Sequence, residues 1–469
     1  MIKIHPKNSF IKNHQSLLEV DFDSQTIEAR KIALELLNEG IKAADPIKAI
    51  HNSVKLVNDE IKFISGSCFL LNDLNKIFVI GAGKATAKMA EGLEEILGQH
   101  IYAGQINVSE NSVKQKLNLK NIQYNIAGHP LVTNGTISGT KKILDLIKGL
   151  SATDLVICLI SGGGSALLEI PVEGITLEDL SELFHILTEA GATIHELNAV
   201  RKHISKIKGG KLAQIIQPAK VISLIISDVI GDTLDTIASG PTAPDLTTWF
   251  GTEQIINKYE IMHKLPLSVQ QVVKQGLTKE VNETLKPDNS TFPNVENIII
   301  ASNARSCDLM KEYAIQNNFS SSIISTNVSG EARDIGREFA EKIKSMKKNT
   351  VLLAGGETTV TIQGKGLGGR NQELALAASQ VIAGTKGIVI ASIGSDGIDG
   401  PTEAAGALVD GYTVLSGSKM ELDIDDFLEN NDSFNYLKQT NNLIITGSTG
   451  TNVMDLIVIV KTGRKKANL

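Results

Sequence analysis

Short, largely apolar segments recur along the chain, and each runs into glycine or small polar residues. The clearest are 76–80, 155–160, 221–226 and 388–393. Runs of this length, bounded by turn residues, are typical of strands buried on both faces of a parallel sheet. Segments with apolar residues at helical spacing lie between them, as in 87–97. This alternation predicts an α/β fold.

The length of 469 residues exceeds what one hydrophobic core usually supports, so two domains are expected. Residues 1–24 show no periodicity and are predicted to be a flexible lead-in. The polar stretch 287–293 has the composition of a linker. The predicted domains are therefore 25–286 and 294–469.

Composition and charge narrow the class of protein. The chain is 42% hydrophobic and 21% charged, which is ordinary for a globular protein, and its net charge of −6 comes without long basic runs. No nucleic-acid or anionic-membrane partner is therefore expected. Three widely spaced cysteines, no apolar run of membrane-spanning length and no apolar core of a signal peptide predict a cytoplasmic protein.

The segment 161–165, SGGGS, follows the predicted strand 155–160 directly. Glycine tolerates positive φ and lets a ligand approach the backbone closely. A strand, a glycine turn and a helix start together offer backbone N–H groups to an anion. A tight turn without a ligand is the alternative, but three glycines between two serines favour anion binding.

A second glycine turn, 81–85, follows the strand 76–80 and carries Lys84. It departs from the dinucleotide fingerprint, because Thr86 takes the third glycine position and Glu110 is the nearest candidate for the acidic residue. It also departs from a Walker A loop, because Ala85 follows the lysine. Lys84 is either a solvated surface lysine or a cation at the mouth of a ligand site.

Polar side chains elsewhere suggest further parts of a site. Asn198, Arg201, Lys202 and Ser205 share one face of a predicted helix, which is either solvated or a cationic face beside an anion. Asp228 and Asp232 follow the strand 221–226. Carboxylates just past a strand end suit Mg²⁺, although such residues also cap turns.

The second half repeats these features. Asp396 follows the strand 388–393 on a glycine-rich loop. The segment 364–369 holds four glycines, which is more than packing alone is expected to require. It leads to Arg370 at the start of a predicted helix, where the helix dipole disfavours a cation, so a bound anion is expected there.

Seven segments, taken together and in order, resemble the class II glycerate 2-kinases, whose C-terminal part is called the MOFRL domain. The segments are GAGKA (81–85), SGGGSALL (161–168), NAVRKHISKIKGGKLA (198–213), SDVIGDTLDTIASGPTAPD (227–245), GGETTVTIQGKGLGGRNQELALA (355–377), GSDGIDGPTEAAGALVD (394–410) and GSTGTNVMDL (447–456). The last one departs from the family pattern at Ser448 and Met454, where proline and asparagine are expected.

The resemblance implies ATP- and Mg²⁺-dependent phosphorylation of D-glycerate on its 2-hydroxyl, giving 2-phosphoglycerate. It implies a Rossmann-like N-terminal domain with a parallel sheet, a smaller α/β C-terminal domain, and an active site in the cleft between them. Lys84 and Arg370 match the catalytic cations of the family. The expected partners are the small molecules ATP and D-glycerate, and the expected state is a monomer or homodimer.

Roles follow for the other candidate residues. The residues expected to bind substrate or phosphate are Ser161, Gly162, Gly163, Gly164, Ser165, Asn198, Lys202, Glu357 and Asn371. The loop 161–165 would hold either glycerate or a nucleotide phosphate. Asp228, Asp232 and Asp396 are the expected Mg²⁺ ligands, and Asp228 or Asp396 could accept the hydroxyl proton.

Two other functions remain open at this point. The first is an NAD(P)-dependent hydroxypyruvate reductase, which Gly81 and Gly83 suggest, although the irregular dinucleotide fingerprint counts against it. A non-catalytic sensor of sugar phosphates or nucleotides is the other, and the density of cations and carboxylates counts against that.

Overall fold

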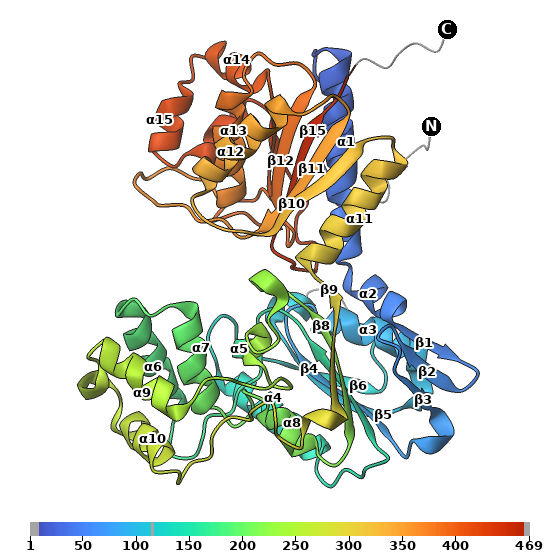
Figure 1. Ribbon diagram of the computed structural model, residues 1–469, viewed down its shortest axis with the longest axis vertical. Helices are drawn as coiled ribbons and strands as arrows, with labels where there is room; N and C mark the ends of the chain where they lie inside the picture. The colour runs from blue at the N-terminus through green and yellow to red at the C-terminus, as the bar shows by residue number, and fades with distance from the viewer. Residues whose placement is uncertain (1–8, 114–116, 464–469) are drawn as a thin grey trace. The chain divides into compact units, whose positions relative to one another are not determined.

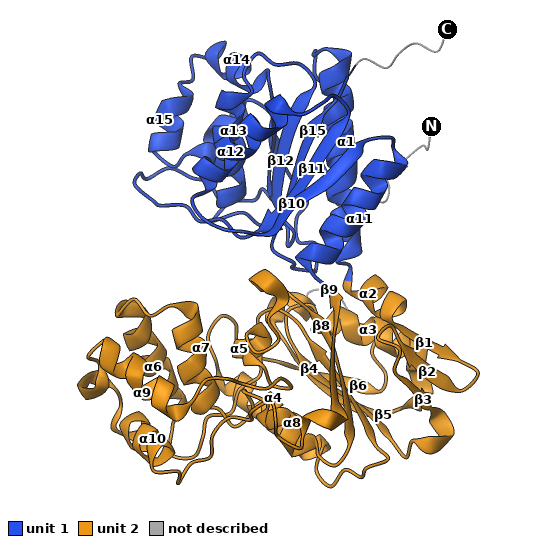
Figure 2. Cartoon of the chain, viewed as in Figure 1, with its two compact units in different colours: residues 1–45, 301–469 blue, residues 46–300 orange. Residues whose placement is uncertain are grey.

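The computed structural model describes residues 9–113 and 117–463, and the chain forms two compact units (Figures 1 and 2). Residues 46–300 form one of them, called the middle unit. Residues 1–45 and 301–469 form the other, called the split unit because it is built from two separate parts of the chain. Each unit is built on a six-stranded sheet, which confirms the α/β expectation.

The sheet of the middle unit has the strand order β6-β5-β4-β7-β8-β9. Its strands are β4 (Ile77–Ala82), β5 (Ile101–Val108), β6 (Ile122–Ile126), β7 (Leu155–Ile160), β8 (Lys220–Ile226) and β9 (Val295–Ala301). Strands β4 to β8 pair in parallel. The chain leaves β4 toward β5 on one side and reaches β7 on the other, so the strand order reverses between β4 and β7. Ligands of open α/β sheets bind outside the carboxyl ends of the strands at such a reversal.

Helices and a small sheet complete the main body of the middle unit. They are α2 (Pro46–Ser53), α3 (Thr86–Leu97), α4 (Asn134–Leu146), α5 (Gly164–Leu167), α8 (Lys211–Ile216) and the antiparallel strands β1 (Val54–Val57), β2 (Glu60–Phe63) and β3 (Cys68–Leu70). The strands β4 and β7 are buried throughout, which explains their unbroken apolar sequences.

A separate helical layer lies beside this sheet in the middle unit (Figure 1). It consists of α6 (Leu177–Glu189), α7 (Ile194–His203), α9 (Trp249–Lys258) and α10 (Leu267–Leu277). The four helices share one apolar core, in which Trp249 is buried. Capping boxes fix the starts of α6 at Thr176 and α7 at Thr193, so the polar side chains of α7 are presented in a defined direction.

The split unit holds a mixed sheet with the strand order β10-β11-β15-β12-β13-β14. Its strands are β10 (Ser320–Val328), β11 (Thr350–Gly356), β12 (Ile388–Gly394), β13 (Gly406–Asp410), β14 (Leu443–Ile444) and β15 (Asp455–Lys461). Alternate residues of β11 enter two different cores: Leu352 packs on the side of α12 (Ala332–Ser345) and α13 (Arg370–Val381), and Leu353 packs on the opposite side. The short helices α14 (Thr413–Ser418), α15 (Ile424–Glu429) and α16 (Ser433–Gln439) follow β13.

The opposite side is covered by α1 (Ser24–Ala43) and α11 (Asn303–Gln316). This differs from the expected division of the chain at 24/25 and 287–293. The chain passes from the split unit into the middle unit after residue 45, so α1 belongs to the split unit, and it returns to the split unit at 300/301. Arg30 of α1 is buried, and its Nε lies 2.5 Å from Oδ2 of Asp410. Amphipathic spacing indicates that a helix covers a core, but it does not indicate which one.

The segment before α1 is also packed rather than flexible where the structure describes it. Ile11 and Leu17 are fully buried in the same core as α1, and the Leu17 carbonyl accepts a 2.7 Å hydrogen bond from Arg30. Residues 1–8 lie outside the described part of the chain. None of the helices that the structure describes could cross a lipid bilayer.

Candidate active site

The two glycine loops predicted separately meet at the point where the strand order reverses. The Lys84 amide donates to the Gly162 carbonyl at 2.9 Å, and the Ala85 amide donates to Oγ of Ser161 at 3.0 Å. Gly83 has a φ of 147°, and a Cβ there would lie 2.0 Å from the same Oγ. Only glycine fits this position, so the turn after β4 and the loop after β7 form one substructure.

The backbone N–H groups of the two loops differ in their availability. In the turn after β4, Gly83 donates to Asn107 at 3.3 Å, and the next two amides donate to the loop after β7. A pyrophosphate therefore finds no free donors where a dinucleotide fold would provide them. The amides of Gly162 and Gly163, in contrast, have no acceptor among the residues that the structure describes. Among the described residues, backbone donors without an acceptor therefore lie in the loop 161–165 and not in the turn after β4.

Three polar side chains converge on this loop. A Cβ on Gly163 would lie 3.3 Å from Cγ of Lys84 and 2.9 Å from Cδ2 of His129, and a Cβ on Gly162 would lie 1.9 Å from Oδ2 of Asp228. The Lys84 side chain is exposed, and its ammonium has no ion-pair partner within the described ranges. Burial and the charge of Lys84 lower the pKa of His129. From the sequence, His129 in the turn 127–130 is either a ligand or base, or a loop residue that makes a structural hydrogen bond.

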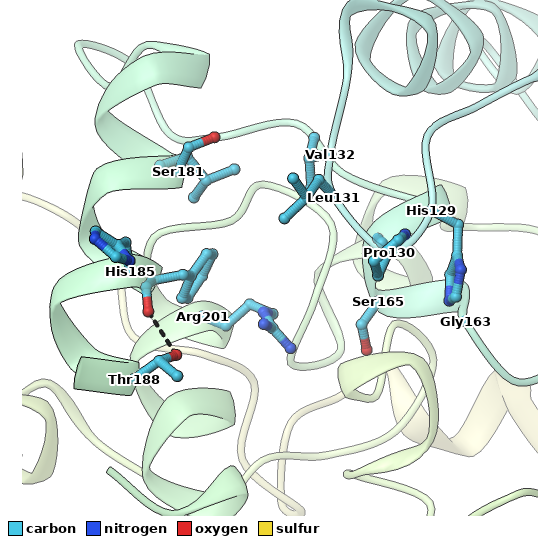
Figure 3. A pocket seen from close by; sticks show the side chains of 13 residues that line it. His129, Pro130, Leu131, Val132, Gly163, Ser165, Ser181, His185, Thr188 and Arg201 are labelled. Carbon is cyan, nitrogen blue, oxygen red and sulfur yellow. Dashed lines mark hydrogen bonds between the residues drawn. The ribbon is translucent and has the colours of Figure 1, made fainter. Parts of the chain in front are cut away.

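A cavity of about 510 Å³ opens beside the loop, entirely within the middle unit (Figure 3). Gly163, Ser165 and His129 line its end near Lys84, and α6 lines the opposite side. Much of the remaining wall is apolar. Arg201 extends from α7 into the space between these walls (Figure 3).

The predicted binding residues of α7 have different environments. Asn198 is connected to the loop, because its Oδ1 lies 3.4 Å from Oγ of Ser239, which lies 2.9 Å from Oγ of Ser165. Lys202 is buried, and its ammonium donates to Asp235 at 2.9 Å and to Asp245 at 3.1 Å. Two carboxylates thus neutralise Lys202, and its neighbour Arg201 lines the cavity instead.

The predicted metal ligands do not gather into a complete site. Among the described residues, no three histidine, cysteine, aspartate or glutamate side chains lie close enough to hold a metal ion. Asp228 lies against Gly162, whereas Asp232 sits in a left-handed conformation with φ of 53° on a short turn. Asp396 belongs to the split unit, where its Oδ1 accepts a 3.1 Å hydrogen bond from the Ile398 amide.

Arg370 begins α13, as expected, but its anionic partners come from the chain itself. Its Nε and Nη2 contact the two oxygens of Asp455 at 2.7 and 2.9 Å, and its Nη1 lies 2.9 Å from Glu357. Asp455 is buried, which raises its pKa to about 6 although Arg370 acts to lower it. The Arg370 side chain stays 33% exposed. Its position at the helix start is therefore explained without a ligand.

The start of α13 is capped by Asp399, which accepts from the amides of Asn371 at 3.1 Å and Gln372 at 2.9 Å. Burial raises the pKa of Asp399. The Asn371 side chain is buried and donates to both Asp399 and Asp455, while its Oδ1 accepts from Ser392. Its amide is thus fully used within the protein, so Asn371 positions the two carboxylates.

The glycines of 364–369 are explained by packing, contrary to the expectation from their number. A Cβ on Gly364 would lie 2.2 Å from the Asn430 carbonyl oxygen, and one on Gly366 would lie 2.5 Å from the same atom. The amides of Gln363 and Gly364 both donate to Oδ1 of Asn431, at 2.7 and 3.0 Å. The loop therefore needs glycine in order to lie against another part of its own chain.

Comparisons with known proteins agree with this architecture. The model of the domain of unknown function DUF4147 matches residues 32–274, and the MOFRL family model matches residues 350–455. A glycerate 2-kinase of Pyrococcus horikoshii is 42% identical over 447 residues, which cover 94% of this chain and 99% of that protein.

The crystal structure of a glycerate kinase from Thermotoga maritima superimposes with a TM-score of 0.81 and 38% identity, covering 92% of this chain and 99% of that one. A putative hydroxypyruvate reductase of Agrobacterium vitis is 36% identical and covers 82% of this chain and 100% of its own length. The chain therefore belongs to the glycerate kinase family with a C-terminal MOFRL domain.

Proposed function

We propose that the protein is an ATP-dependent glycerate 2-kinase that phosphorylates the 2-hydroxyl of D-glycerate, giving 2-phosphoglycerate and ADP. The observation that carries this proposal is the ammonium of Lys84 beside the amides of Gly162 and Gly163, all three without a partner in the part of the chain that the structure describes. The names of the glycerate kinases among the relatives support it.

Phosphoryl transfer needs little covalent chemistry from a protein, and its rate depends on positioning and on stabilising negative charge. Lys84 supplies a mobile point charge next to two backbone donors. Arg370 supplies a second cation, whose orientation is fixed by the two oxygens of Asp455. A guanidinium held in this way loses little further freedom when it binds phosphoryl oxygens.

The residues around the loop also fit Mg²⁺. The ion prefers one or two carboxylates together with water and substrate phosphates, and Asp228 offers such a carboxylate beside the glycine loop. When bound, Mg²⁺ would neutralise charge on the phosphate oxygens. Asp232 and Asp396 remain candidate ligands. Asp228, Asp396 or the imidazole of His129 would accept the proton from the 2-hydroxyl.

Phosphorus NMR of the reaction products tests the proposed function. The protein is incubated with ATP, Mg²⁺ and D-glycerate, and the signals of 2-phosphoglycerate and ADP are expected to grow together. A reaction without the nucleotide controls for contaminating phosphate esters. A 3-phosphoglycerate product would refute the assigned position, and a lack of any product would refute the kinase assignment.

A hydroxypyruvate reductase is the alternative that one relative's name raises. The occupied amides of the turn after β4 count against it, because a pyrophosphate would have to displace hydrogen bonds within the protein. Mixing the protein with NADH and hydroxypyruvate decides the matter. We expect no loss of the absorbance of the reduced nicotinamide.

A further inference from the structure

Arg201 is a cation that lines the cavity. Among the described residues, no carboxylate lies within ion-pair distance of its guanidinium, whereas the next residue, Lys202, contacts two. The guanidinium donates instead to the neutral Oδ1 of Asn198 at 3.0 Å, and its central carbon lies 4.4 Å from the ring centroid of Phe184.

This environment disfavours a lone charge. Burial lowers the pKa of Arg201, although the charge of Glu169, which is outside ion-pair distance, acts to raise it. A cation removed from water is stabilised when an anion pairs with it. The planar fork of an arginine matches a carboxylate with two parallel hydrogen bonds. A carboxylate bound in the cavity would therefore stabilise the charged form of Arg201.

The same cavity reaches the proposed site of phosphoryl transfer. Ser165 and Gly163 line it together with Arg201, and Gly163 lies next to the Lys84 side chain. Asn198 and Ser239 link the Arg201 guanidinium to Ser165 through hydrogen bonds. An anion held by Arg201 therefore belongs to a molecule whose other end can approach Lys84.

We propose that Arg201 binds the carboxylate of the acceptor and so selects 2-hydroxy acids over uncharged alcohols. This inference rests on the proposed kinase function. Arg201 is the sole lysine or arginine among the described residues that line the cavity. One cation and largely apolar walls suit a ligand with a single carboxylate, whereas a nucleoside triphosphate would bring several negative charges into the same space.

Steady-state kinetics of Arg201→Gln and Arg201→Lys test this inference. We expect the KM for D-glycerate to rise about 10- to 100-fold in Arg201→Gln, the effect of losing hydrogen bonds to a charged group. The KM for ATP should stay within about 2-fold, and Arg201→Lys should recover part of the loss. Arg337→Gln, which removes a partly exposed arginine of the split unit, is the matched control and should match the wild type.

An uncharged acceptor gives a second readout that a merely structural role would not produce. With the primary amide of D-glyceric acid, wild type and Arg201→Gln should have kcat/KM values within about 3-fold of each other, because the lost interaction needs a carboxylate. An equal loss with acid and amide overturns the inference. A raised KM for ATP with an unchanged KM for D-glycerate also overturns it, because the anion would then be a nucleotide phosphate.

Equilibrium binding separates this inference from the proposed function. Calorimetric titration of D-glycerate without nucleotide should detect binding to the wild type and at least 10-fold weaker binding to Arg201→Gln. Equal affinities, or no binding to either, overturn the inference. If the wild type forms no phosphorylated product but binds D-glycerate through Arg201, the kinase assignment fails and the carboxylate site stands.

Discussion

Replacing Asp455 by asparagine tests how the split unit holds Arg370. Asp455 is buried, and its pKa is raised to about 6 from an ordinary value near 4. Because the pKa of Asp455 is higher in the folded than in the unfolded protein, the unfolded state binds fewer protons at pH values between the two pKa values. The contribution of Asp455 to stability therefore falls as the pH rises from about 4 to about 6, by roughly 3 kcal/mol in total.

Asparagine does not titrate, so the variant lacks this loss. Between about pH 4.5 and pH 7, the unfolding free energy of Asp455→Asn minus that of the wild type should increase by about 2 kcal/mol. Hydrogen exchange of the β15 peptide in wild type and variant, compared at each pH, measures the difference and cancels the effect of pH on exchange itself. In the same variant kcat should fall by about 10-fold, because Arg370 loses its charged anchor.

A difference in β15 stability that does not change with pH would refute the reasoning, since it would mean that Asp455 keeps an ordinary pKa in the folded protein. An unchanged kcat with the expected pH dependence would refute only the positioning of Arg370. Asp425→Asn, which replaces an exposed carboxylate at the start of α15, is the matched control and should show neither effect.

Three further predictions concern the middle unit. Lys84→Ala should lower kcat about 10³-fold in a coupled assay of ADP release, while Lys88→Ala, which removes the cation of an ion pair with Glu91 in α3, should leave kcat unchanged. Gly162→Ala places a methyl group 1.9 Å from Oδ2 of Asp228, so the Mg²⁺ concentration needed for half-maximal activity should rise, as a metal titration would reveal. Lys202→Met leaves two carboxylates without their cation and should cost about 3–5 kcal/mol, measured by urea unfolding.

The strands that position the site could be predicted almost to the residue. The apolar run 155–160 is β7, and the run 388–393 is β12 apart from one additional residue. Both strands are buried over their whole length, and continuous burial produces a continuous apolar sequence. The glycine turns after β4 and β7 could be identified for the same reason, since a parallel strand must end in a turn toward a helix.

The partners of charged side chains could not be predicted, because they come from distant parts of the sequence. Arg30 pairs with Asp410, which is 380 residues away in the sequence, and Arg370 pairs with Asp455, which is 85 residues away. Helical spacing placed Arg201 and Lys202 on one polar face, yet one faces a cavity and the other faces two carboxylates. Helical periodicity indicates the side of the helix on which a side chain lies, but not which residues or cavity that side chain contacts.

Glycine-rich segments were ambiguous for a related reason. The loop 161–165 keeps two amides without an acceptor among the described residues, whereas the first three amides of 364–369 donate to Asn430 and Asn431. Glycine permits the close approach of any backbone or ligand. The number of glycines in a segment therefore indicates that something packs closely against it, but not whether that is a ligand or another part of the protein. The three-dimensional contacts are needed to separate the two cases.

The placement of α1 in the split unit affects the order in which the protein can fold during synthesis. The apolar face of α1 packs against β15, whose residues are translated more than 400 positions later. At about 5–20 residues per second, roughly 20 to 80 seconds pass between them on the ribosome. The middle unit can fold within this interval, but α1 cannot bury Leu36 and Leu37 in their native core until translation is nearly complete. We expect nascent chains to expose this helix to chaperones throughout the delay.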